Sequence, residues 1–159
     1  MNKYNYINLA KKAARTQIRE LTKIKSVFNN NFVKAVDLIL NCKGKVILAG
    51  IGKSGLIARK ISATFSSVGI PSFFCDPAQA LHGDMGQIER KDLLIIFSYS
   101  GNTAELSNML KYANRFRIKI IGVASKPDST LLKASDIKLI LPKVIESDIT
   151  GMVPTSSTS

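Results

Sequence analysis

Short apolar runs alternate with helical patterns between residues 46 and 141, and this alternation constrains the fold more than any other feature of the chain. The runs are nearly continuous in apolar residues, which is typical of strands buried on both faces. Strands separated by helices form βαβ units, whose strands lie parallel in one sheet. The pattern therefore predicts a three-layer α/β/α sandwich around a five-stranded parallel sheet. The apolar runs are residues 46–49, 72–75, 93–97, 118–124 and 137–141, and the helical patterns are residues 56–67, 103–116 and 129–134.

Two helices are predicted before the first strand. Apolar residues recur at helical spacings and form one stripe along a helix of roughly 25 residues. Three asparagines at positions 29–31 end this helix, and a second helix is expected over residues 32–40. The chain of 159 residues has a size that suits one domain. We expect residues 1–42 to pack as helices on an α/β domain of residues 43–159. The stripe consists of Ile7, Ala14, Ile18, Leu21 and Phe28.

The formal net charge of +12 is concentrated in the N-terminal helices. Residues 1–45 contain ten lysines and arginines against only Glu20 and Asp37. Such a segment is typical of binding to nucleic acid or to an anionic surface. A solvated basic face is the simpler interpretation, and we favour it because no aromatic cluster that could stack on bases accompanies the charge. We therefore expect no nucleic-acid partner.

The sequence favours a cytoplasmic protein without a membrane partner. The N-terminus carries basic residues but no apolar core of a signal peptide. No apolar run approaches the roughly 18 residues of a membrane span. Cys42 and Cys75 form no close-spaced motif, which fits a reducing compartment.

In a parallel sheet, ligands bind beyond the carboxyl ends of the strands, so the loops after the apolar runs are the candidate site. The first loop, GIGKSG at residues 50–55, is not a P-loop, because Ile47 stands where that motif has its first glycine. It does match G-x-G-x-x-G. Asp76 lies about where an acid that binds a ribose hydroxyl is expected, so a dinucleotide-binding domain is an alternative.

Two features favour a phosphate monoester over a dinucleotide. Lys53 places a cation inside the glycine-rich turn. A second loop, SYSGNT at residues 98–103, carries the hydroxyls of Ser98, Ser100 and Thr103 at the start of a helix, where free backbone N–H groups favour anions. Capping of the helix is the structural alternative for these hydroxyls. The hydroxyl run TSST at residues 155–158, expected on the same rim, favours phosphate.

These motifs together resemble those of sugar isomerase (SIS) domains, and most closely the arabinose-5-phosphate isomerases. The similar segments are GIGKSG at 50–55, PSFF at 71–74, ALHGD at 80–84, SYSGNTAE at 98–105 and VPTSST at 153–158. They occur in the family's order across roughly residues 43–158. The resemblance implies interconversion of ribulose 5-phosphate and arabinose 5-phosphate, an early step toward the Kdo sugar of lipopolysaccharide. It implies no metal and no organic cofactor, and it implies oligomers with sites near subunit interfaces.

The resemblance also assigns roles to residues. Isomerisation through an enediol(ate) needs a base, an acid and a group that stabilises negative charge. Lys53 is implied to stabilise oxyanion or phosphate charge, and Glu105 and Glu146 to transfer protons. His82, the only histidine, is implied to lie near the sugar, while a lone histidine is a poor metal site. The residues expected to bind substrate or phosphate are Gly52, Ser54, Ser98, Ser100, Gly101, Asn102, Thr103, Thr155, Ser156, Ser157 and Thr158.

The sequence departs from the family after the hydroxyl run. Family members continue into further helices with a Ser-His-Pro-Gly-Gly segment, and most add a pair of CBS domains, whereas this sequence ends at Ser159. Gln79 stands where the family commonly has glutamate. We expect a sugar phosphate to bind and to be turned over poorly, and a sugar-phosphate-binding remnant or sensor is the alternative. We also expect a homodimer or homotetramer with Ile18, Leu21 or Phe28 in its interface.

Overall fold

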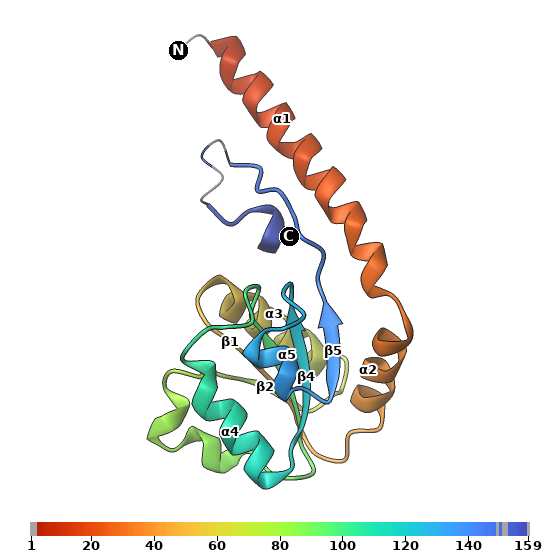
Figure 1. Cartoon of the computed structure of the whole chain (residues 1–159), viewed down its shortest axis with the longest axis vertical. Helices are drawn as coiled ribbons and strands as arrows, with labels where there is room; N and C mark the ends of the chain where they lie inside the picture. Colours follow the sequence, from red (N-terminus) through yellow and green to blue (C-terminus); the bar gives the residue numbers. More distant parts are fainter. Residues whose placement is uncertain (1–2, 149, 151–152, 159) are drawn as a thin grey trace. The chain divides into compact units, whose positions relative to one another are not determined.

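The computed structural model describes residues 3–148, 150 and 153–158, and the chain divides into two compact units (Figure 1). Residues 27–141 form one unit, and residues 1–26 together with 142–159 form the other. The predicted boundary at residue 42 stays a prediction, and its outer limits, residues 1 and 159, lie outside the described residues.

The unit of residues 27–141 contains the predicted five-stranded parallel sheet, in the order β2-β1-β3-β4-β5. The predicted fold class is confirmed, and most predicted elements begin and end within three residues of the observed ones. The strands are β1 (Val46–Gly50), β2 (Ser72–Cys75), β3 (Leu93–Phe97), β4 (Lys119–Ala124) and β5 (Ile137–Ile140). The helices are α2 (Asn30–Leu40), α3 (Lys53–Ser67), α4 (Leu106–Phe116) and α5 (Thr130–Ala134), with short 3-10 helices η2 (Ala80–His82) and η3 (Asp84–Gln87).

Alternate residues of each strand bury opposite faces of the sheet. Leu48 packs in a cluster with Ala35 of α2 and Ala58 of α3, so these two helices cover one face. Ile47 packs in a second cluster with residues of α4 and α5, which cover the other face. Both strand side chains are fully buried. Burial of each such side chain contributes about 1.5–3 kcal/mol, so the two clusters hold the three layers together.

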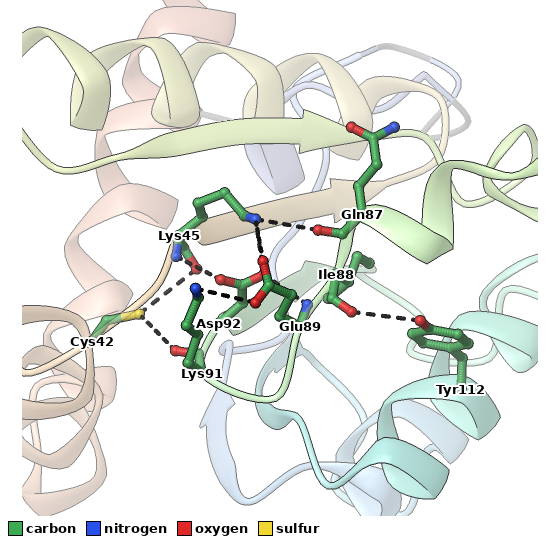
Figure 2. Close-up of polar contacts among 8 residues, drawn as sticks. All are labelled: Cys42, Lys45, Gln87, Ile88, Glu89, Lys91, Asp92 and Tyr112. Carbon is green, nitrogen blue, oxygen red and sulfur yellow. Dashed lines mark hydrogen bonds and ion pairs between the residues drawn. The ribbon is translucent and has the colours of Figure 1, made fainter.

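A polar cluster joins the loops that lead into β1 and β3 (Figure 2). Asp92 is buried, and its two carboxylate oxygens accept hydrogen bonds from the backbone N–H groups of Lys45, at 2.7 Å, and Glu89, at 2.8 Å. The Lys45 ammonium lies 3.5 Å from the same carboxylate. Gly44 contacts it so closely that an added Cβ would lie 2.2 Å from the Asp92 Oδ1. The cluster thus satisfies the buried Asp92 carboxylate at the amino ends of β1 and β3.

The second unit contains α1 (Lys3–Thr22), the first residues of η1 (Lys23–Val27) and η4 (Ser156–Thr158). The prediction of one helix as far as Phe28 is wrong, because the α-helix ends at Thr22 and a 3-10 turn follows. The Thr22 hydroxyl donates to the Arg19 carbonyl at 2.6 Å and competes with the backbone at this end. Two members of the predicted apolar stripe, Ile18 and Leu21, are 66% and 50% exposed.

Among the side chains of α1 that the structure describes, the buried one is Glu20. The Glu20 carboxylate accepts hydrogen bonds from the Lys23 ammonium, from the Ile145 backbone N–H at 3.0 Å and from the Arg19 guanidinium at 3.0 Å. The bonds from Lys23 and Ile145 lower the pKa of Glu20 to about 2. This ionised group therefore ties α1 to the segment after residue 142. No described helix is both long enough and apolar enough to cross a membrane.

Candidate functional site

The order of the strands creates one switch point in the sheet, between β1 and β3. The chain moves from β1 outward to β2 on one side, and then returns to β3 on the other side. Gly50 at the end of β1 is the register partner of Phe97 at the end of β3. The loops that follow, GIGKSG and SYSGNT, therefore start side by side at the position where open α/β sheets bind ligands.

The glycines of the first loop meet specific conformational demands. Gly52 stands immediately before α3. Its φ of 58° is positive, and residues with a side chain disfavour this backbone conformation. A Cβ at Gly55 would lie 2.6 Å from the Gly50 carbonyl oxygen, so glycine permits close packing of helix on strand. Lys53 is the first residue of α3, is exposed and forms no ion pair among the described residues. Ser54 is half-buried beside it. The turn thus presents a cation and the unpaired N–H groups of a helix start.

The second loop is held by its own hydroxyls. Ser98 is buried, and its hydroxyl lies 2.8 Å from the Thr103 hydroxyl and accepts from the Gly101 N–H at 3.1 Å. Ser100 is exposed, and its hydroxyl accepts from the Asn102 N–H at 3.3 Å. Ser98 and Thr103 therefore shape the loop from within, while Ser100 faces solvent at the sheet edge.

A connection to α5 fixes the same loop from outside. The Asn102 side-chain oxygen accepts from the Thr130 N–H at 2.9 Å and from its hydroxyl at 3.2 Å. Gly101 has φ 68°, and a Cβ there would lie 2.2 Å from the Ser129 hydroxyl oxygen. Sequence reasoning did not identify Ser129 and Thr130 as supports of the loop, and only their place after the fourth strand pointed to this edge.

Two charged candidates flank these loops. Glu105 is exposed and stands just before α4, which begins at Leu106 and not at Thr103 as predicted. The reason is that residues 103–105 form turns before the helix, with the Leu106 N–H bonded to the Thr103 carbonyl. His82 is exposed at the end of η2, in the segment that follows β2. Among the described residues there is no cluster of three or more potential metal ligands.

Asp76, on which the dinucleotide alternative rests, closes its own turn. One of its carboxylate oxygens accepts from the Ala78 N–H at 2.9 Å. This bond holds the turn, and the carboxylate keeps acceptor sites with which it can bind a ribose hydroxyl.

The remaining candidates, Glu146 and the hydroxyl run, lie in the other unit. The Glu146 carboxylate accepts from the Thr155 N–H at 2.7 Å, from the Thr155 hydroxyl at 3.0 Å and from the Ser157 N–H at 3.3 Å. Burial raises the pKa of Glu146, but hydrogen bonds from Ser157 and Thr155 outweigh this effect and hold the pKa below its ordinary value. Ser156 and Thr158 belong to the single turn of η4. Two residues of the hydroxyl run, Thr155 and Ser157, therefore donate hydrogen bonds to the ionised Glu146 carboxylate.

The predicted site residues thus form two groups, one in each unit. Residues 27–141 hold His82, Glu105 and the two anion-type loops, and residues 142–159 hold Glu146 and the hydroxyl run. The roles predicted for all of them stay predictions.

Comparison with known proteins identifies relatives over almost the whole chain. The model of the SIS domain matches residues 39–159. Protein RP505 of Rickettsia prowazekii, described as uncharacterized, is 42% identical over 157 residues. Arabinose 5-phosphate isomerase KdsD of Escherichia coli K12 is 38% identical over 139 residues, 87% of this chain. The chain spans 49% and 42% of the lengths of these two relatives.

A solved structure is also similar to this chain over almost its whole length. The structure of Escherichia coli CFT073 c3406 in complex with a sugar phosphate superposes with a TM-score of 0.89 at 34% sequence identity. The match covers 99% of this chain and 84% of that one.

Proposed function

Because the chain belongs to the SIS domain family, we propose that it binds a sugar phosphate in the crevice between the loops after β1 and β3. The observation that carries this proposal is the adjacency of the two loops, whose strands pair Gly50 with Phe97. Both loops lead into helices or turns whose first N–H groups can bind an anion, and Lys53 adds a cation that forms no ion pair with any residue the structure describes. The sugar phosphate in complex with c3406, a structural relative at 34% identity, supports the same ligand class.

We propose further that the substrate is arabinose 5-phosphate and that the reaction is its interconversion with ribulose 5-phosphate. Similarity to KdsD at 38% identity supports this assignment. A base removes the proton from C2 of the aldose, the electron pair forms an enediolate, and a proton is returned to C1 while the hydroxyl proton passes from O2 to O1. No external oxidant or cofactor is needed for this balance. In the reverse direction the same steps form arabinose 5-phosphate from ribulose 5-phosphate, and arabinose 5-phosphate would serve the synthesis of the Kdo sugar of lipopolysaccharide.

Each proposed role fits a property of its side chain. Lys53 would stabilise the enediolate or the phosphate, because an exposed, unpaired ammonium at a helix start can meet an anion. Glu146 would act as a base, because its carboxylate is ionised at neutral pH and can accept a proton, although its lowered pKa makes it a weaker base than an ordinary glutamate. Glu105 and His82 are exposed on the same unit as Lys53 and would complete the proton transfer.

Binding without turnover is the second candidate function. The observation that favours it is that Glu146 already accepts three hydrogen bonds from Thr155 and Ser157. A carboxylate so engaged is a weaker base, and it also occupies donors that were expected to hold the phosphate.

A homodimer or homotetramer is proposed as the assembled form. Ile18 and Leu21 of α1 are 66% and 50% exposed, and Phe28 in the other unit is 58% exposed, so each unit carries an exposed apolar side chain that a partner would cover.

The experiment that tests the proposal is a thermal-shift panel of arabinose 5-phosphate, ribulose 5-phosphate and NAD, followed by an isomerase assay. Sugar phosphates should raise the melting temperature and NAD should not, since a ligand that binds only the folded state stabilises it. Lys53→Ala should weaken binding of arabinose 5-phosphate by about tenfold, the loss of one charge-assisted hydrogen bond.

Lys60→Ala is the matched control, because Lys60 is exposed on the same helix. It should bind like the wild type. Equal affinity of Lys53→Ala and Lys60→Ala for arabinose 5-phosphate would refute the site, and stabilisation by NAD alone would favour the dinucleotide alternative.

A further inference from the structure

A groove of about 480 Å³ lies at the edge of the sheet opposite the proposed sugar-phosphate site. Its lining residues lie at the end of α4, at the start of β4, and just before β3 and β5. Because α4 runs antiparallel to the strands, its last residues meet the amino ends of the sheet. The lining residues are Arg90, Asn114, Arg117, Ile118, Lys119 and Asp136.

The groove carries cationic charge that its one carboxylate does not neutralise. Asp136 accepts from the Lys119 ammonium at 2.6 Å through one oxygen and from the Ile120 N–H at 2.9 Å through the other. Both of its oxygens are therefore engaged. Arg90 and Arg117 are exposed, and neither forms an ion pair among the described residues. Two arginines that form no ion pair among the described residues thus line the same groove.

The backbone of Arg117 supplies an independent observation. Its φ of 56° and ψ of 38° are left-handed, and among the described residues it is the only non-glycine residue with positive φ. The position follows a helix end closed by the Ile118 N–H bonded to the Ala113 carbonyl at 2.9 Å, where glycine is the common residue. A side chain there strains the backbone, so the conformation disfavours arginine relative to glycine.

Stabilisation of the helix end does not account for both arginines. Cations near a helix C-terminus interact favourably with its dipole, and Arg115 already lies in the last turn of α4. Arg90 lies outside the helix, before β3, yet lines the same groove. The shared feature of Arg90 and Arg117 is therefore the groove itself.

We propose that this groove is a second anion site, which binds a phosphate group through Arg90 and Arg117. Guanidinium groups bind phosphate oxygens in bidentate geometry, and the Asn114 side chain offers a further donor. The site is independent of the proposed function, because it lies on the other edge of the sheet and shares no residue with it. Inorganic phosphate and a phosphate monoester present the same group.

The test is an amide-resolved NMR titration of the full chain with inorganic phosphate, and separately with arabinose 5-phosphate, at constant ionic strength held with sodium chloride. Saturable shifts are expected at Asn114 and at residues 117–120. Signals at residues 50–55 and 98–103 report on the sugar-phosphate site, so the two proposals fail separately. Tighter binding of the sugar phosphate at residues 117–120 would identify a monoester as the ligand, and equal binding would identify the phosphate group alone.

Arg117→Gly is the decisive variant, because glycine suits the left-handed backbone and the fold is retained. It should weaken phosphate binding at residues 117–120 by about tenfold or more, as expected for a lost charge-assisted hydrogen bond. Arg115→Ala removes a charge from the same helix end but does not line the groove, and its affinity should stay within about twofold, as for a screened surface charge. No saturable shift at millimolar phosphate, or equal losses in both variants, would overturn the proposal.

Discussion

Gly101→Ala is predicted to distort the SYSGNT loop and to destabilise the fold. The added Cβ would lie 2.2 Å from Oγ and 2.4 Å from Cβ of Ser129, and the residue has φ 68°. The left-handed backbone costs about 1–2 kcal/mol for alanine, and overpacking of a filled space costs about 1–3 kcal/mol. The variant should therefore lose about 2–5 kcal/mol of unfolding free energy, a large share of the 5–15 kcal/mol typical of a domain.

The same change should also weaken the proposed ligand site. The Gly101 carbonyl accepts from the Leu131 N–H at 2.9 Å, and Asn102 accepts from Thr130, so relief of the clash would move the loop away from α5. Urea denaturation measures the loss of stability, and a thermal-shift titration with arabinose 5-phosphate measures the loss of binding.

Two further variants separate the causes. Gly86→Ala is the matched control, because a Cβ there meets no atom within 4 Å and its φ is not in the left-handed region. It should be neutral or stabilise by up to about 1 kcal/mol. Ser129→Gly combined with Gly101→Ala removes the close contact but keeps the strained φ of residue 101. In a double-mutant cycle, the double variant should therefore regain the unfolding free energy lost to overpacking, but not the part lost to the strained φ. Stability of Gly101→Ala within about 1 kcal/mol of the wild type would refute the reasoning.

Three other outcomes are expected. Asp92→Ala should lower the unfolding free energy by about 3–5 kcal/mol in urea denaturation, because it removes two hydrogen bonds from the part-buried N–H groups of Lys45 and Glu89 to a buried carboxylate; a loss below about 1 kcal/mol would contradict this. The folded-state pKa of Glu20 is depressed to about 2. Its stabilising contribution is therefore present above the ordinary value near 4.5 and is lost as pH falls from there toward 2; Glu20→Gln should flatten this part of the stability–pH profile, and an unchanged profile would refute the assignment. Ile18→Asp should shift the light-scattering mass of the proposed oligomer toward that of the monomer, and a wild type that is monomeric at high micromolar concentration would remove the proposal.

The fold followed from the sequence because its signals are local. Apolar runs and helical spacings occur within single elements, so strands such as β3 and helices such as α3 were predicted to within a few residues. The GIGKSG and SYSGNT loops were found for the same reason, since strand ends and their turns are contiguous in the chain. The end of α1 was missed because apolar spacing continues through a 3-10 turn that a side-chain hydrogen bond at Thr22 favours.

The supports of the candidate site were decided by tertiary structure. The hydrogen bond between Asn102 and Thr130 joins residues 28 positions apart, and the one between Glu20 and Ile145 joins residues 125 positions apart. No local sequence pattern predicts contacts over such separations. The close approach of Gly101 to Ser129 likewise depends on how α5 packs beside the loop.

What the sequence by itself determined is therefore the set of strands and helices, the parallel sheet and the loops with phosphate-type chemistry. Only the tertiary structure decided the strand order that sets β1 beside β3, the engagement of Glu146 by Thr155 and Ser157, and the left-handed backbone of Arg117 at a basic groove. The physical reason is that periodicity reports which face of an element is buried, whereas partners and backbone strain depend on which elements the whole chain brings into contact.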